Sequence, residues 1–361
     1  MAKSLQRLFR GIRMKTAAKL IENGSFLINN FNLTPRLIKN FMKIIFLGQK
    51  PLRTVDLCFD YQCNYKCQHC YAVDFANPKK KGMSLDDYKL AIDKCVAEGA
   101  IHFNLVGGEP TMDKRLFDVV RHAKKRGSVI SLATNGSLLT KEYCLELKKI
   151  GLDVVLISMD QPDKTDLDKF RNKGCYEDVM SALDNCVKTG LKVFISAVLT
   201  PQSLRDGKTK KLLQFCIDRK ILLHTNLPAI MGRWKNQTQF FFNEEDQQLV
   251  RELYKNRYVH ACEMSSYFKT ACRSGWEKLH ITEYGDVMPC TFVPIQFGNI
   301  LTDNLDDIRK KMHDYKLFKG HIEMCIPSTH LGYRKLYEEK ISKNKYLPVS
   351  HKDVVLDENT N

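Results

Sequence analysis

The sequence contains no run of about 18 apolar residues, so we expect no helix that spans a membrane. Its first residues lack the apolar core and the small-residue cleavage site of a secretory signal. Thirteen cysteines in a chain without such a signal favour metal ligands or reduced thiols over disulfides. We therefore expect a cytoplasmic protein in a reducing compartment.

Acidic residues are nearly missing from the first 50 positions, which hold ten Lys or Arg residues and only Glu22 as an acid. Apolar residues recur at helical spacing in residues 3–22 and again from Pro35 to about Gly48, which predicts a basic amphipathic helical extension over residues 1–50. We expect its apolar face to pack on the main domain, with peripheral membrane contact as the alternative. Aromatic residues are not interleaved with the charges, so no nucleic acid is expected as a partner.

Three cysteines lie close together after the apolar run of residues 54–59, at Cys63, Cys67 and Cys70. Three thiols cannot all pair as disulfides, but a short loop can bring them to one metal centre. Thiolates are the ligands of iron–sulfur clusters, and three ligands leave one iron of a four-iron cluster open for chemistry. Zinc is the alternative metal, although it usually takes four protein ligands, often as paired C-x2-C motifs.

The C-x3-C-x2-C spacing, with His69 just before the last cysteine, resembles the signature of the radical S-adenosylmethionine (radical SAM) superfamily. The resemblance implies a catalytic [4Fe–4S] cluster on Cys63, Cys67 and Cys70, with S-adenosylmethionine chelated to the fourth iron. It also implies reductive cleavage of S-adenosylmethionine to a 5′-deoxyadenosyl radical, which abstracts hydrogen from a substrate. The implied partners are that substrate and an electron donor such as flavodoxin or ferredoxin.

Short β-rich runs alternate with helical patterns through residues 51–230, which predicts a parallel sheet in an α/β fold. Six strand–helix units are too few for an eight-stranded barrel, and the family resemblance implies a partial (β/α)6 TIM barrel. The predicted strands are 54–59, 101–106, 128–133, 153–159, 192–199 and 221–227. The predicted helices are 84–98, 114–126, 140–149, 175–189 and 206–219.

Polar motifs follow these strands, at the edge of the sheet where barrels carry their active sites. Gly107-Gly108-Glu109-Pro110 resembles the family's GGEP motif, which holds the methionyl amino group. Ser158 and Asp160 resemble its ribose contacts, and Arg171 resembles an arginine that pairs with the cofactor carboxylate, with a solvated surface arginine as the alternative. The resemblance thus assigns cofactor binding to His69, Gly107, Gly108, Glu109, Pro110, Thr134, Asn135, Ser158, Asp160, Arg171 and Val198.

A second group of cysteines follows a predicted bridge at residues 231–260. Cys272, Gly285 and Cys290 form a C-x12-G-x4-C pattern, with a hairpin predicted around the glycine. The pattern resembles SPASM and twitch domains, so residues 261–330 are expected to bind one auxiliary iron–sulfur cluster. The expected ligands are Cys272, Cys290 and Cys325, with Cys262 as the fourth ligand or with the site open to substrate. The remaining cysteine run of a full SPASM domain is missing.

The C-terminal residues 331–361 are polar and charged, and we expect a short helix followed by a frayed tail. The substrate is left open by the family resemblance. Oxidation or epimerisation of a small polar or sugar-like molecule is our first expectation, and maturation of a ribosomally made peptide is the second. An enzyme acting on a lipid-linked substrate is a third hypothesis. A non-catalytic iron–sulfur electron carrier is the alternative from a different class of protein.

Overall fold

The computed structural model describes residues 33–262, 267, 271–319 and 322–354. The chain divides into two compact units, Met1–Gln49 and Lys50–Asn361. The predicted helix over residues 3–22 lies outside the described residues. In the part of the chain that the structure describes, no helix is long and apolar enough to cross a membrane.

Helix α3 (Thr34–Leu47) belongs to the first unit and confirms the second helix predicted in the N-terminal extension. Proline at its start suits a position where the backbone amide needs no partner. It ends at Gly48, whose φ of 61° closes the helix in the left-handed conformation. Several large apolar side chains of the helix are exposed: Ile38, Met42, Ile45, Phe46 and Leu47. Packing and membrane contact of this face both stay predictions.

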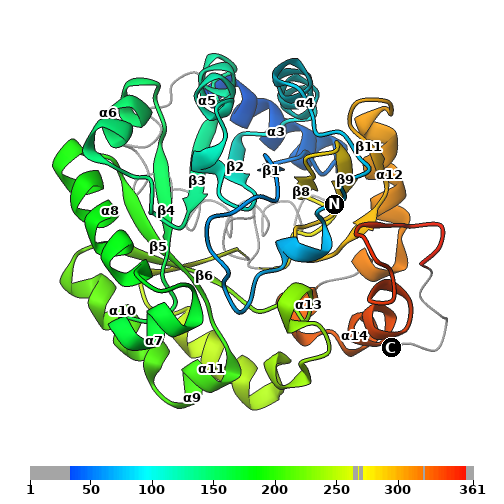
Figure 1. Ribbon diagram of the computed structural model, residues 1–361. Helices are drawn as coiled ribbons and strands as arrows, with labels where there is room; N and C mark the ends of the chain where they lie inside the picture. Colours follow the sequence, from blue (N-terminus) through cyan, green and yellow to red (C-terminus); the bar gives the residue numbers. More distant parts are fainter. Residues whose placement is uncertain (1–32, 263–266, 268–270, 320–321, 355–361) are drawn as a thin grey trace, which may run out of the picture. The chain divides into compact units, whose positions relative to one another are not determined.

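The second unit is built on a ten-stranded sheet with the order β11-β9-β8-β1-β2-β3-β4-β5-β6-β7 (Figure 1). The strands from β8 to β7 in this order pair in parallel, whereas β9 and β11 are antiparallel to their neighbours. All six predicted strands are confirmed. The strands are β1 (Thr54–Cys58), β2 (His102–Val106), β3 (Val129–Thr134), β4 (Val154–Ser158), β5 (Val193–Val198), β6 (Leu222–Asn226), β7 (Val259–Ala261), β8 (Lys278–Ile281), β9 (Asp286–Met288) and β11 (Gly298–Asn299).

Helices connect the parallel strands and lie along the outer side of the curved sheet (Figure 1). The predicted helices are confirmed, and α4 begins at a capping box in which Ser84 and Asp87 each accept a backbone hydrogen bond from the other. The helices are α4 (Leu85–Ala97), α5 (Leu116–Lys125), α6 (Lys141–Lys149), α7 (Lys164–Phe170), α8 (Cys175–Thr189), α9 (Pro201–Arg205), α10 (Lys208–Asp218), α11 (Glu244–Leu253), α12 (Leu305–Asp314), α13 (Ile326–Thr329) and α14 (Leu331–Leu336).

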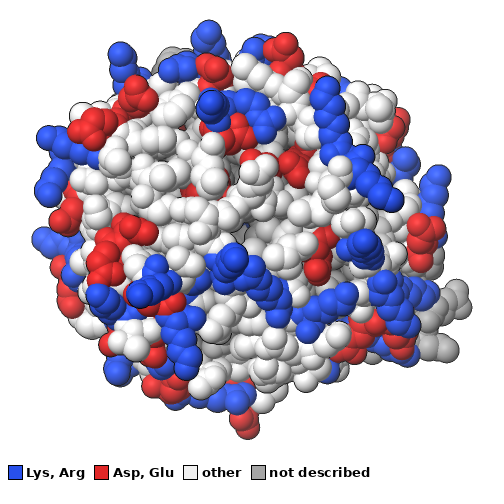
Figure 2. All heavy atoms as spheres, viewed as in Figure 1, with Lys and Arg blue, Asp and Glu red and all other residues white. Residues whose placement is uncertain are grey.

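The surface is basic, in keeping with the formal net charge of +16. On the face shown in Figure 2, Lys and Arg side chains form a band across the lower half, and Asp and Glu lie scattered between them. Isolated ion pairs on such a surface contribute little to stability. The excess of positive charge instead favours partners that carry acidic surfaces.

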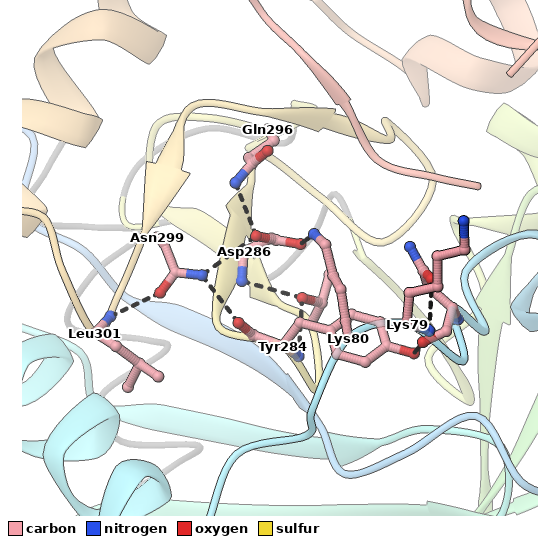
Figure 3. Close-up of polar contacts among 9 residues, drawn as sticks. Lys79, Lys80, Tyr284, Asp286, Gln296, Asn299 and Leu301 are labelled. Carbon is pink, nitrogen blue, oxygen red and sulfur yellow. Dashed lines mark hydrogen bonds and ion pairs between the residues drawn. The ribbon is translucent and has the colours of Figure 1, made fainter.

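Strands β8 and β9 form the predicted hairpin, and Gly285 at its turn has a φ of +81°. A Cβ at this glycine would lie 2.8 Å from the side chain of Asn299, whose amide donates to the carbonyl of Tyr284. Figure 3 shows Lys80 reaching Asp286 on β9, with 2.7 Å between Nζ and Oδ2. The ion pair attaches the hairpin to the loop that follows the three-cysteine motif.

The predicted bridge at residues 231–260 contains more structure than a connector. Helix α11 lies in this segment, and β7 follows it and pairs in parallel with β6. The hairpin also joins the sheet, because β8 pairs in parallel with β1. The segment that carries the second group of cysteines therefore continues the barrel sheet past β1, which the sequence did not predict.

The frayed tail predicted at the C-terminal end is wrong up to Val354. Strand β12 (Val349–Ser350) pairs in parallel with β10 (Ile295–Gln296), and Val354 is 1% exposed. The imidazole of His351 stacks on Phe297 with 4.9 Å between ring centroids. A few apolar and aromatic residues in a polar segment are enough to hold it against the sheet.

Candidate active site and auxiliary metal centre

The three-cysteine motif lies on the loop that follows β1, at the C-terminal edge of the parallel sheet. The backbone amide of Tyr65 donates to Cys63 Sγ at 3.3 Å, and the amide of Cys70 donates to the carbonyl of Cys67 at 3.3 Å. Burial raises the pKa of Cys63 to about 11, with smaller contributions from Glu109, Cys67 and Cys70. The three thiols therefore lie close enough to influence one another.

The donor set on this loop fits an iron–sulfur cluster. All three cysteines are free and partly exposed, so their thiols can be reached by iron and sulfide. Among the described residues, no three His, Cys, Asp or Glu side chains surround a single metal-ion position. A four-iron cluster places its ligands on different irons, so three cysteines on one loop suit a cluster, whereas zinc usually takes four protein ligands.

Two glycines hold the loop after β2 against the cysteine loop. The amide of Gly108 donates to the carbonyl of Asp60 at 2.7 Å, and the amide of Glu109 donates to the carbonyl of Gln62 at 2.8 Å. A Cβ at Gly108 would lie 2.0 Å from that carbonyl oxygen of Gln62, and one at Gly107 would lie 2.7 Å from the carbonyl oxygen of Asp60. Only glycine permits this approach of two backbones.

The carboxylate of Glu109 is buried and joins the loops after β2 and β3. Its Oε1 accepts from the amide and the hydroxyl of Thr111 and, at 2.6 Å, from the hydroxyl of Thr134. Its Oε2 accepts from the amide of Asn135 at 2.7 Å. Burial raises the pKa of Glu109, and these hydrogen bonds oppose the rise. Protein donors thus occupy most of the carboxylate, and its contact with a methionyl amino group stays a prediction.

Asn135 connects this pair of loops to the cysteine motif. Its Nδ2 donates to Asn64 Oδ1 at 2.8 Å and lies 3.9 Å from Cys63 Sγ. Pro110 is buried in the 3-10 turn that follows Glu109. The structure therefore brings together the GGEP residues, the turn of Thr134 and Asn135 after β3, and the first cysteine, as the strand-end argument predicted.

Arg171 forms a buried ion pair with Asp160. The two side chains are 8% and 2% exposed, and Nε donates to Oδ2 at 2.5 Å. Burial alone would lower the pKa of Arg171, but the carboxylate of Asp160 outweighs it and raises the pKa. Arg171 Nη1 lies 4.0 Å from Cys67 Sγ, and Asp160 Oδ1 accepts from the amide of Val198 at 2.8 Å.

The alternative of a solvated surface arginine is therefore wrong for Arg171, because the side chain is buried beside Cys67. Ser158 lies at the end of β4, in register with Ser196 of β5. The cofactor contacts assigned to Ser158, Asp160, Arg171 and Val198 stay predictions. The structure shows that three of them, on separate elements, already form one hydrogen-bonded set.

Aromatic rings enclose the second half of the cysteine loop. The ring of His69 stacks on Phe170 with 4.8 Å between centroids and lies 5.5 Å from the ring of Trp234. Arg233 Nη1 donates to the carbonyl of Cys67 at 3.0 Å, so this arginine supports the loop. Sequence reasoning missed Phe170, because nothing in the spacing of residues relates it to a motif about a hundred positions earlier.

In the second group of cysteines, Cys272 precedes β8 and Cys290 follows β9, whereas Cys262 follows β7 and Cys325 precedes α13. Burial raises the pKa of Cys290 to about 12, Lys278 opposes the rise, and Cys262 and Cys272 add to it, so these three thiols are near one another. The amide of Cys272 donates to the carbonyl of Ile322 at 2.8 Å, which brings the segment before Cys325 alongside.

Two cations lie against this group. Lys278 Nζ is 3.6 Å and Arg273 Nη2 is 3.7 Å from Cys262 Sγ. Two positive charges here would offset the negative charge of a cluster held by thiolates. The four cysteines Cys262, Cys272, Cys290 and Cys325 therefore fit an auxiliary iron–sulfur cluster, and Cys262 as its fourth ligand stays a prediction.

Comparisons with known proteins identify the two domains that carry these cysteines. Residues 59–213 match the model of the radical SAM superfamily, and residues 272–329 match the model of the SPASM iron–sulfur cluster-binding domain. The chain is a radical SAM enzyme with a SPASM domain. A [4Fe–4S] cluster and S-adenosylmethionine are the cofactors of the first domain, and the second implies auxiliary iron–sulfur binding.

Relatives of this radical SAM enzyme carry different functions. It is 35% identical over 150 residues to the Fe-coproporphyrin III synthase of Methanosarcina barkeri, a match over 40% of this chain and 36% of that protein. It is 23% identical over 314 residues to the subtilosin biosynthesis protein AlbA of Bacillus subtilis, a match over 79% of this chain and 67% of that protein.

A solved structure shares the fold across almost the whole chain. Streptococcus suis SuiB bound to the precursor peptide SuiA superposes with a TM-score of 0.62 at 17% identity, over 90% of this chain and 79% of that one. The likeness shows that the two chains share a fold. The partial TIM barrel and the family predicted from the cysteine spacing are confirmed.

Proposed function

We propose that this radical SAM enzyme matures a peptide, the hypothesis that ranked second on the sequence alone. The match to AlbA carries the proposal, because its 314 aligned residues reach across both the barrel and the SPASM domain. SuiB, which shares the fold over 90% of the chain, was solved with a precursor peptide bound. A small sugar-like substrate has no comparable support, and a lipid-linked substrate has none.

The residues of the site divide the work of such a reaction. Cys63, Cys67 and Cys70 would hold the cluster, which with S-adenosylmethionine supplies a 5′-deoxyadenosyl radical. Arg171 offsets negative charge beside Cys67, since its guanidinium lies 4.0 Å from the sulfur. The ring of His69, packed between aromatic neighbours, keeps water from this side of the loop.

The loops after β2 and β3 set the other side of the site. Glu109 fixes Thr134 and Asn135 in place through hydrogen bonds, so this turn stays aligned with the cysteine loop. Asp160 orients the amide of Val198 at the end of β5. The backbone groups around the proposed cofactor site are therefore fixed in place before the cofactor binds.

A porphyrin is the second candidate substrate. It is favoured by the 35% identity to the Fe-coproporphyrin III synthase over 40% of this chain, and by the 22% identity to the AdoMet-dependent heme synthase of Nitratidesulfovibrio vulgaris over 76% of this chain. Peptide and porphyrin can be told apart directly. The reconstituted chain is incubated under reducing, anaerobic conditions with S-adenosylmethionine and either capped peptides deuterated at carbon or deuterated iron coproporphyrin III. Deuterium in 5′-deoxyadenosine from the peptides supports our proposal, and deuterium from the porphyrin alone contradicts it.

An electron donor is the further partner that we propose, and flavodoxin or ferredoxin fits the requirement for a one-electron reductant. The basic band in Figure 2 supports an acidic carrier. Peripheral membrane contact through residues 1–50 is supported by the exposed apolar residues of α3. Co-sedimentation with anionic vesicles tests this contact, and the absence of binding at low salt would rule it out.

A further inference from the structure

The inner face of the barrel sheet is unusually polar. On β2, β5 and β6, buried positions alternate with partly exposed ones, as expected when one face is packed under helices and the other faces an open interior. Barrel interiors are ordinarily filled by branched apolar residues, and buried polar groups are expensive without partners. The partly exposed positions nevertheless include His102, Asn104, Ser196, His224 and Asn226.

Asp56, in the middle of β1, is the centre of the interior hydrogen bonds. Its Oδ2 accepts from Lys278 Nζ at 2.8 Å and from Thr291 Oγ1 at 2.9 Å, and its Oδ1 accepts from Asn104 Nδ2 at 3.0 Å. Burial alone would raise the pKa of Asp56, but Lys278 and the other donors outweigh it and lower the pKa to about 2. Asp56 is therefore an ionised carboxylate, which can accept hydrogen bonds but cannot donate them.

This carboxylate fixes the direction of the hydrogen bonds around it. The hydroxyl of Thr291 has one proton, which it donates to Asp56, so it must accept from His280 Nδ1 at 2.9 Å. Burial lowers the pKa of His280 to about 4, and its ring is therefore neutral. With the proton on Nδ1, the Nε2 of His280 is a bare acceptor, and it is buried without a hydrogen-bond partner.

On the other side of Asp56, too, each hydrogen bond is donated toward the carboxylate. Asn104 donates to the carboxylate, Ser131 Oγ donates to Asn104 Oδ1 at 2.9 Å, and His102 Nε2 must then donate to Ser131 Oγ at 2.8 Å. Burial lowers the pKa of His102 to about 3, so this ring is neutral too. Its Nδ1 is left as a second bare acceptor.

The charges of this interior cancel. Lys278 and Asp56 pair with each other at 2.8 Å, and His224 is neutral because burial, His260 and Lys278 lower its pKa. His224 and His260 share a hydrogen bond between their Nδ1 atoms at 3.0 Å. An additional charge would find no free partner among these side chains, whereas a neutral donor would find two unused acceptor nitrogens.

The network also lies between the two metal centres. At one end Lys278 Nζ is 3.6 Å from Cys262 Sγ in the auxiliary group. From there β1 runs to the loop of Cys63, Cys67 and Cys70, and five residues of strand span roughly 13 Å. A group held beside Asp56 would thus be close to the cofactor side and to the auxiliary side at once.

We propose that this interior receives the reacting residue of the substrate, and that His280 Nε2 and His102 Nδ1 accept hydrogen bonds from a neutral N–H or O–H group on it. The inference rests on the proposed peptide function, and it adds which side chains of the peptide the enzyme would accept. A side chain with an amide or hydroxyl fits these acceptors. A carboxylate of the same shape brings only lone pairs and a charge, and is rejected.

The selectivity is tested with two probes of nearly equal shape. The reconstituted full chain is given capped Gly-Asn-Gly or capped Gly-Asp-Gly, each deuterated at carbon in its central residue, and the deuterated fraction of 5′-deoxyadenosine is measured. We expect a fraction at least about tenfold higher with the asparagine probe, the effect of one buried hydrogen bond. Equal fractions, or a preference for the aspartate probe, overturn the inference.

Variants assign the effect to His280. His280→Ala should lower the deuterated fraction from the asparagine probe about tenfold, and His280→Gln, which keeps an acceptor, should recover part of it. His122→Ala is the matched control, because His122 lies on α5 and pairs with Asp93 outside the barrel. Loss in His122→Ala, or native values in His280→Ala, contradicts the assignment. Unlabelled 5′-deoxyadenosine from every peptide would instead remove the peptide function, and this inference with it.

The tautomer of His280 provides a test that does not depend on enzyme activity. In the full chain labelled with nitrogen-15 in its histidine rings, the signals lost in His280→Ala identify this residue. Long-range proton–nitrogen spectra should show its proton on Nδ1, and Thr291→Val should release that preference whereas Thr291→Ser should keep it. A proton on Nε2 of the native chain overturns the inference, whatever the substrate assays show.

Discussion

Arg171 and Asp160 show how single residues carry much of this site. Their ion pair is buried, it contacts Cys67 through the guanidinium, and it holds the end of β5 through the carboxylate. The sequence suggested the cofactor role of both residues by resemblance, but it could not show that they pair. Each member of such a pair depends on the other, because either one alone would be a buried charge without a partner.

Removing the guanidinium should therefore be costly. Arg171→Met is expected to lower the free energy of unfolding by about 3–5 kcal/mol, because Asp160 is left buried without its partner. Urea unfolding of the metal-free chain measures the loss. Arg121→Ala is the control, since its ion pair with Asp118 is half exposed, and it should change the free energy by less than about 1 kcal/mol. Equal effects of the two variants would refute the account of Arg171.

His280 predicts a pH dependence of stability. Its pKa of about 4 in the folded chain lies below the ordinary value for histidine, so the folded state binds fewer protons than the unfolded state between these values. The contribution is complete above about pH 6.5 and is lost as the pH falls toward 4. Between pH 7.5 and pH 5, the free energy of unfolding should fall by about 2 kcal/mol less in His280→Gln than in the native chain. If His280→Gln lost as much unfolding free energy as the native chain over this range, the ring of His280 could not be neutral and buried in the folded chain.

At the scale of elements, the long features of the fold were predictable from sequence and the short ones were not. The strands and helices of the barrel have enough residues to show their periodicity, and the cysteine motif is contiguous. Strands β7 and β12 have three and two residues, too few for any alternation to appear. The pairing of β8 with β1 and the ring of Phe170 beside His69 depend on contacts between distant segments.

The C-terminal segment offers a test of an element that was mispredicted. Val354→Asp should lower the free energy of unfolding by about 3 kcal/mol or more, because it places a charge where the valine is 1% exposed. Lys352→Asp is the control on an exposed neighbour and should stay within about 0.5 kcal/mol. Thermal or urea unfolding compares them. Equal stability of the two variants would mean that the segment is not packed as described.

At the scale of the whole molecule, one continuous sheet connects two groups of cysteines. The Cys63 group follows β1, and the Cys290 group lies beside β8, which pairs with β1. The family model fixed the kind of chemistry, but the order of hydrogen bonds between the groups could only come from the structure. No sequence pattern reveals that Thr291 and Asn104 both direct their protons to Asp56.

Iron counts test the presence of the second centre. The reconstituted native chain should hold about eight irons, and Cys272→Ala combined with Cys290→Ala should reduce this to about four. Cys95→Ala combined with Cys216→Ala is the matched control, because both residues are buried in helices away from the two groups. Full iron content without Cys272 and Cys290 would show that they hold no cluster.

The central claim is that Cys63, Cys67 and Cys70 support cleavage of S-adenosylmethionine. The most direct measurement is 5′-deoxyadenosine formed by the anaerobically reconstituted and reduced chain, compared with Cys67→Ala and with Cys216→Ala as control. We predict 5′-deoxyadenosine from the native chain and from Cys216→Ala, and none above background from Cys67→Ala. Equal yields from the native chain and Cys67→Ala, or zinc in place of iron on the native chain, would contradict the claim.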